Sequence, residues 1–104
     1  MKNLGPRELA DYLAAHQPLL LDVREPWAFD ICHLADAKLV PMQQVPAWAE
    51  RADKDQEVVV ICHHGIRSRQ VAMYLEHLGF TRVINLAGGV QEWAREVDPQ
   101  MPTY

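Results

Sequence analysis

Apolar residues follow two spacings along this chain, and the two spacings alternate. Short apolar runs occupy positions 19–23, 38–40, 58–61 and 83–86. Runs of this length are typical of strands buried on both faces of a parallel sheet. Around them, apolar residues recur every three or four positions, which predicts amphipathic helices. The alternation predicts an α/β fold with a mostly parallel central sheet and helices on both faces.

Proline, glycine and serine mark several of the expected boundaries. Pro6 suits the first turn of a helix. Gly79 is expected in a left-handed conformation at the end of a later helix, and Ser68 is expected to cap the start of that helix. A length of 104 residues predicts one domain over residues 1–104, of which residues 97–104 form an extended tail.

The most uniformly apolar strand, Val58–Ile61, leads directly into a cysteine. Cys62 is followed by a short segment that contains Gly65, and then by the start of a helix. Backbone N–H groups point inward at such a strand–turn–helix junction, so the junction favours anions and the thiolate form of a cysteine. We therefore predict that Cys62 is the nucleophile of an active site, although most free cysteines are buried and inert.

The segment after Cys62 supplies several groups that would stabilise negative charge. Arg67 adds a permanent positive charge, and the following helix adds the positive end of its dipole. A cysteine in such surroundings attacks sulfur electrophiles and also leaves readily, as sulfur transfer requires. His63 and His64 are equally compatible with solvated loop positions that only add positive potential. The predicted substrate-binding residues are His63, His64, Gly65, Ile66, Arg67 and Ser68.

Two charged residues close the first predicted strand. Asp22 and Arg24 fall at the carboxyl end of 19–23, which is the edge of a parallel sheet at which ligands bind and at which Cys62 also lies. We expect them to support the site. The favoured interpretation is an ion-pair cluster that holds the loops, because structural networks of this kind are common.

Composition excludes several classes of function. The formal net charge of −4 argues against nucleic-acid binding. No apolar run is long enough for a signal peptide or a membrane span, so we expect a cytoplasmic protein. In that compartment Cys32 and Cys62 should not form a disulfide. Together with their neighbouring histidines they match no zinc spacing, and we expect neither a metal nor a cofactor.

Three segments together resemble a known family. They are LLLDVREPWAF (Leu19–Phe29), VVVICHHGIRS (Val58–Ser68) and VINLAGGVQEW (Val83–Trp93). In this order and at this spacing the chain is similar to the single-domain rhodaneses, which are sulfurtransferases, over essentially its whole length. The resemblance implies a five-stranded rhodanese-like fold. It also implies that Cys62 accepts a sulfane sulfur, becomes a persulfide, and passes the sulfur to a thiol or to cyanide.

Two details of the resemblance affect what we expect. Family members usually have Pro-Gly where this chain has Ala35-Asp36, which leaves the shape of that turn open. The loop ends in Gly-Ile-Arg and lacks the Gly-Val-Thr ending of the mercaptopyruvate-using relatives. Arg67 suits a dianion, so thiosulfate is the favoured donor. The expected partners are a small-molecule donor and a thiol or cyanide acceptor, with a thioredoxin-like or other sulfur-acceptor protein as a further candidate.

Three other functions compete with a general sulfurtransferase. A persulfide carrier that serves one protein acceptor has the same sequence features. A partner-binding rhodanese module without activity would usually lack Cys62. A Cys-dependent phosphatase or arsenate reductase has a loop that resembles C-x5-R, whereas four residues separate Cys62 from Arg67 here. A phosphoryl group needs a wider ring of donors than one sulfur does, so the spacing favours sulfur.

Overall fold

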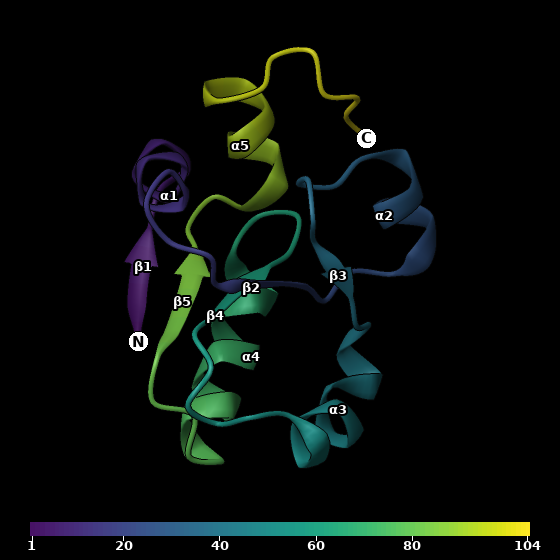
Figure 1. Ribbon diagram of the computed structural model, residues 1–104. Helices are drawn as coiled ribbons and strands as arrows, with labels where there is room; N and C mark the ends of the chain where they lie inside the picture. Colours follow the sequence, from purple (N-terminus) through teal and green to yellow (C-terminus); the bar gives the residue numbers. More distant parts are fainter.

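A computed structural model describes the whole chain, residues 1–104, and its centre is a five-stranded sheet. The strand order is β1-β5-β4-β2-β3, and every pairing is parallel (Figure 1). The strands are β1 (Lys2–Leu4), β2 (Leu19–Asp22), β3 (Lys38–Leu39), β4 (Val58–Ile61) and β5 (Val83–Leu86). This arrangement confirms the predicted parallel α/β fold.

Helices occupy the connections between the strands. They are α1 (Pro6–Leu13), α2 (Pro26–Ile31), the 3-10 helix η1 (Met42–Gln44), α3 (Val45–Arg51), α4 (Ile66–His77) and α5 (Gly89–Glu96). None of these helices is both long and apolar enough to cross a membrane. After α5 the chain makes a turn in which Met101 N–H donates to the Asp98 carbonyl, and residues 97–104 contain no helix or strand.

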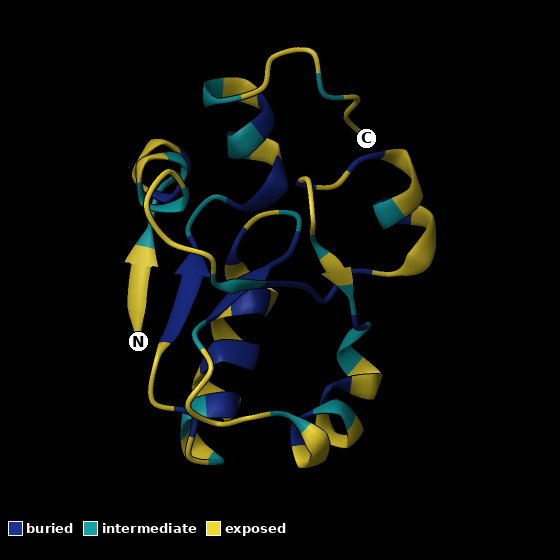
Figure 2. Ribbon diagram, viewed as in Figure 1, coloured by how far each residue is buried: buried dark blue, intermediate teal, exposed yellow.

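The apolar pattern missed one strand. β1 has the sequence Lys-Asn-Leu, and two of its three residues are exposed (Figure 2). It pairs in parallel with β5 at the edge of the sheet, with Asn3 in register with Asn85. Its backbone pairing comes from a strand more than 80 residues away, so the local sequence has no apolar run to reveal it.

Two apolar cores lie on opposite faces of the sheet, and β4 contributes to both. Val58, Val60 and Cys62 join the core under α3 and α4, whereas Val59 and Ile61 join the core under α1 and α5. This division follows from the period of two along a strand. All four β4 residues are fully buried, which accounts for the unbroken apolar run in the sequence. The same alternation directs the Cys62 side chain toward α4.

The boundaries of α4 differ in part from the prediction. Gly79 has a φ of 103°, as expected of a left-handed residue after a helix. The predicted cap at Ser68 is wrong, because α4 begins at Ile66 and Gly65 is the N-cap residue. Ser68 instead lies inside the first turn and is completely buried. Its hydroxyl group is a hydrogen-bond partner of the Cys62 thiol and does not cap the helix.

The turn at Ala35-Asp36 keeps a glycine-like backbone without a glycine. Asp36 has a φ of 67° and is the only residue other than glycine with a positive φ. Aspartate tolerates this left-handed conformation better than most residues, because its short polar side chain can bond locally. The departure from Pro-Gly therefore leaves a left-handed residue at this position.

Substitutions at Asp36 should show how much the left-handed backbone at this position costs. Asp36→Val should lower the free energy of unfolding by about 1–2 kcal/mol, because a β-branched side chain clashes in the left-handed region. Asp36→Gly should be at least as stable as the parent. The neighbouring exposed residue serves as the control, and Ala35→Val should change stability by less than about 0.5 kcal/mol. Urea unfolding measures all three; a fully stable Asp36→Val would contradict a left-handed turn.

Candidate active site

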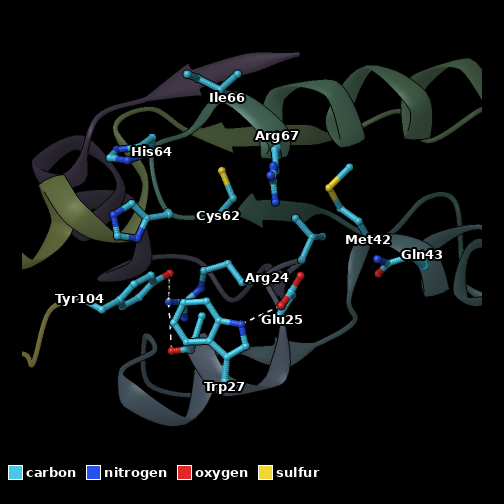
Figure 3. A pocket seen from close by; sticks show the side chains of 13 residues that line it. Arg24, Glu25, Trp27, Met42, Gln43, Cys62, His64, Ile66, Arg67 and Tyr104 are labelled. Carbon is cyan, nitrogen blue, oxygen red and sulfur yellow. Dashed lines mark hydrogen bonds between the residues drawn. The ribbon is translucent and has the colours of Figure 1, made fainter.

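The carboxyl ends of β2 and β4 border a pocket of about 610 Å³ (Figure 3). Asp22 of β2 is in register with Ile61 of β4, so the residues that follow the two strands lie side by side. Figure 3 shows Cys62 and Arg67 projecting into the same space, with Trp27 and Tyr104 on the opposite side. Segments that are distant in the sequence thus form one site, at the edge where parallel sheets bind ligands.

Cys62 lies at the base of this pocket with its sulfur surrounded by donors. The residue is 4% exposed, and its Sγ accepts hydrogen bonds from the backbone N–H groups of Gly65 (3.1 Å) and Ser68 (3.3 Å). Gly65 is the N-cap residue of α4 and Ser68 lies in its first turn. The first N–H groups of a helix have no carbonyl partner within the helix, so these two are free to donate to the sulfur. Such N–H groups stabilise negative charge on the sulfur or on a group attached to it.

Gly65 allows the loop to curl around the sulfur. Its φ is 89°, and a Cβ atom there would lie 2.7 Å from the Gly88 nitrogen and 2.9 Å from the Leu86 carbonyl oxygen. Any other residue would therefore be strained by its backbone conformation and would also collide with the turn after β5. The left-handed backbone and these close contacts are the reason that position 65 requires glycine.

The turn after β5 holds the loop from the other side. The N–H groups of Val90 and Gln91 at the start of α5 donate to the carbonyls of Cys62 (2.9 Å) and His63 (3.1 Å). A Cβ atom on Gly89 would lie 2.3 Å from the His63 oxygen and 2.5 Å from the Cys62 oxygen. The residue pattern identified Gly88-Gly89 only as a turn. The adjacent glycines after a buried strand were the available signal for this close backbone contact.

Arg67 and Ile66 extend from the loop into solvent. Arg67 lines the pocket and is exposed, and its guanidinium group has no hydrogen-bond or ion-pair partner in the protein. Its charge is therefore available to an anion. Ile66 also lines the pocket and is 68% exposed, so it contributes an apolar contact at the rim.

Asp22 and Arg24 form a buried ion pair, of which only Arg24 lines the pocket. Arg24 Nη2 lies 2.6 Å from Asp22 Oδ2, and the remaining Arg24 donors bond the Ala28 and Cys32 carbonyls and the Tyr104 hydroxyl. Burial opposes the charge, but the hydrogen bonds with Asp22 and Tyr104 outweigh it and raise the pKa of Arg24. With its donors occupied and its charge balanced, Arg24 holds the loop after β2 in place.

The two loop histidines line the pocket in different ways. His64 is exposed, whereas His63 is partly buried, with its ring 4.3 Å from that of Tyr104. Partial burial lowers the pKa of His63, repulsion from His64 lowers it further, and a 3.1 Å hydrogen bond to Gln91 opposes the change. His63 Nδ1 is buried without a partner, which suits the neutral ring. At neutral pH His63 therefore contributes a neutral polar ring to the lining of the pocket and no positive charge.

The structure separates the two cysteines. Cys32 lies in the core under α1 and α5, while Cys62 lies on the opposite face of the sheet, and both are free. Cys32 does not line the pocket; its sulfur is 3.9 Å from Arg24 Nη1. No group of three histidine, cysteine, aspartate or glutamate residues is placed so that it could hold a metal ion.

Comparisons with known proteins agree with this geometry. The model of the rhodanese-like domain matches residues 5–96. A rhodanese-like/PpiC domain-containing protein of Arabidopsis thaliana is 36% identical over 101 residues, which are 93% of this chain and 34% of that protein. The thiosulfate sulfurtransferase GlpE of Vibrio cholerae is 38% identical over 79 residues, which are 76% of this chain and 74% of GlpE.

A solved structure supports the same conclusion. The rhodanese-like domain protein of Staphylococcus aureus superposes with a TM-score of 0.82 at 31% identity, covering 93% of this chain and 95% of that one. The chain thus spans about a third of the Arabidopsis protein but most of the bacterial single-domain proteins.

The contact between Gly89 and the Cys62 loop yields a steric prediction. Gly89→Ala should lower the free energy of unfolding by about 1–3 kcal/mol and change the rate at which iodoacetamide alkylates Cys62, because the new methyl group must displace the loop carbonyls. Gly5→Ala is the control, since Gly5 has a φ of −71° and the nearest atom to its Cβ would be 3.4 Å away. Equal behaviour of the two variants would show that the contact tolerates a side chain.

Proposed function

This chain belongs to the rhodanese family, and on that basis we propose that it is a sulfurtransferase that moves a sulfane sulfur from thiosulfate through a persulfide on Cys62. The observation that supports this most directly is the pair of N–H donors aimed at the buried Cys62 sulfur, next to an unpaired Arg67. The family match also supports sulfur chemistry over the phosphatase alternative.

The reaction divides into two displacements at sulfur. The Cys62 thiolate attacks the outer sulfur of thiosulfate, the new S–S bond forms, and sulfite leaves with the electron pair of the bond that breaks. An acceptor thiolate or cyanide then attacks the outer sulfur of the persulfide, and Cys62 leaves as thiolate. Both steps place negative charge at the loop after Cys62, on thiosulfate and sulfite in the first and on the persulfide and the Cys62 thiolate in the second. Groups of the loop that stabilise negative charge therefore assist both steps.

Arg67 supports thiosulfate as the donor. Its guanidinium group lines the pocket without a protein partner, and a charge-assisted contact to the sulfonate oxygens of a dianion would satisfy it. The printed name of the Vibrio relative, a thiosulfate sulfurtransferase, agrees with this choice. By contrast, the charge of Arg24 is already balanced by Asp22, so Arg24 is proposed as a support for the loop and not as a donor-binding group.

The rim of the pocket supports a second candidate, a carrier that delivers sulfur to a protein thiol. Ile66 is 68% exposed and Trp27 is 56% exposed, and both line the pocket. Exposed apolar side chains around a reactive group offer contact area to a protein partner, which cyanide or a small thiol would not need. A thioredoxin-like acceptor would fit this description. The persulfide chemistry is the same for both acceptors, and a reducing compartment such as the cytoplasm suits the two free cysteines.

The persulfide should form on Cys62 and not on Cys32. Incubation with thiosulfate followed by intact-mass and peptide mass spectrometry should show one added sulfur at Cys62. Cys62→Ser should lose both the added mass and the transfer of sulfur to cyanide, whereas Cys32→Ser should retain both, because Cys32 lies on the other face of the sheet. Full activity in Cys62→Ser would refute the proposal.

Arg67 should bind the donor in addition to its effect on the sulfur. Arg67→Ala should lower kcat/KM for thiosulfate by about ten- to a hundredfold, since a hydrogen bond to a charged group contributes roughly 1.5–3 kcal/mol. This defect should persist at high pH, where alkylation by neutral iodoacetamide returns to the parent rate. Arg69→Ala removes an exposed charge from the same helix outside the pocket and is the control. If the thiosulfate defect disappears at high pH together with the alkylation defect, Arg67 acts on the sulfur alone.

A further inference from the structure

A chain of hydrogen bonds runs from Cys62 into the sheet through the side chains of Ser68 and Asn85. The Cys62 thiol and the Ser68 hydroxyl are 3.2 Å apart, and Ser68 Oγ lies 2.5 Å from Asn85 Oδ1. Ser68 is fully buried and Asn85 is 2% exposed. Asn85 is the one polar residue of β5, and the strand alternation places it on the same face as Val83, beneath α4. A polar side chain in this core needs partners, and these contacts supply them.

The contacts of Asn85 determine which way its amide points. Its Nδ2 lies 3.2 Å from the Gly65 carbonyl oxygen and 3.0 Å from Asn3 Oδ1. A backbone carbonyl can only accept, so the NH₂ group of Asn85 must face Gly65. The amide oxygen therefore faces Ser68, and it too can only accept. The single hydroxyl hydrogen of Ser68 is consequently directed to Asn85 and away from the sulfur.

This orientation makes Ser68 an acceptor toward Cys62. A neutral Cys62 thiol is compatible with this orientation of the Ser68 hydroxyl, because the S–H group can donate to the lone pairs of Ser68 Oγ. A thiolate is not, since it would face those lone pairs or would require the hydroxyl to rotate and leave the buried Asn85 oxygen unpaired. The two N–H donors of the loop favour negative charge on the sulfur, and the Ser68–Asn85 pair opposes it.

We propose that Asn85 is a positioning residue that, through Ser68, disfavours negative charge on Cys62 Sγ and so prolongs the life of the persulfide. Only the effect on the lifetime of the persulfide rests on the proposed function; the effect on the charge of Sγ does not. On loading, the negative charge moves from Sγ to the outer sulfur; on transfer to an acceptor, it returns to Sγ as Cys62 leaves. A group that destabilises charge on Sγ therefore favours loading and slows the release of sulfur.

The first test is alkylation by iodoacetamide as a function of pH, which needs no sulfur transfer. Ser68→Ala and Asn85→Leu should move the pH–rate profile to lower pH by about one unit, because the first removes the acceptor and the second frees the hydroxyl to donate. Asn85→Asp should move it to higher pH, since a carboxylate retains the acceptor and adds negative charge. A role for Asn85 in packing alone would not give shifts of opposite sign.

Asn3→Ala is the matched control. It removes one hydrogen bond of Asn85 at an exposed position, but the Gly65 carbonyl still orients the amide. Its profile should coincide with that of the parent. If Ser68→Ala instead moves the profile to higher pH, Ser68 donates to the thiolate and the proposal is overturned. Ser68→Ala is a small change, so this outcome can be measured even where an Asn85 variant does not fold.

The second test is the release of sulfur in a single turnover. Protein loaded with thiosulfate and freed of donor is mixed with cyanide, and thiocyanate is followed with time. Ser68→Ala should release sulfur roughly three- to tenfold faster than the parent, because its Cys62 is the better leaving group. An unchanged release rate beside a shifted alkylation profile would overturn the link to persulfide lifetime. Failure of the parent to load at all would refute the proposed function and leave the alkylation result standing.

Discussion

The close contact between two backbone segments is the constraint on which the site depends. The loop that follows Cys62 and the turn that follows β5 approach so closely that neither Gly65 nor Gly89 has room for a Cβ atom. The same approach allows the first N–H groups of α5 to bond the Cys62 and His63 carbonyls. These bonds hold the carbonyls away from the sulfur, so that the N–H groups of the loop point inward. The arrangement of donors around Cys62 thus depends on backbone packing between the loop after β4 and the turn after β5.

Charge is distributed around the pocket according to burial. Arg24 is buried, and Asp22 and two carbonyl groups satisfy it, which is the condition under which a buried charge is stable. Arg67 is exposed and has no protein partner, so its charge is accessible to water and to an anion in the pocket. His63 remains neutral because it is partly buried beside His64. The pocket thereby presents one permanent positive charge without a protein partner next to a sulfur, whereas the charge of Arg24 is balanced by Asp22.

The Ser68–Asn85 pair gives the sulfur two opposing influences. Backbone donors favour the anion, whereas an acceptor oriented by a buried amide favours the neutral form. In the proposed persulfide cycle the Cys62 sulfur must both attack and leave. An intermediate stability of its thiolate serves both steps, because a thiolate that is too stable is a weak nucleophile and one that is too unstable is a poor leaving group. This balance is set by hydrogen bonds that connect the active-site loop to the neighbouring strand.

The sequence by itself determined the parallel fold, the position of Cys62 and the loop around it, because these depend on local patterns. Short apolar runs predicted four of the five strands, and a cysteine between a buried strand and a glycine-containing turn predicted the nucleophile that we propose. Tertiary structure alone decided the rest. β1 is a strand only because β5 lies beside it. Ser68 faces the sulfur because α4 begins three residues earlier than a serine cap implies, and Asn85 meets Ser68 because β4 and β5 pair in register. Each of these contacts joins distant segments, and a hydrogen bond between distant segments has no signature in the spacing of either one.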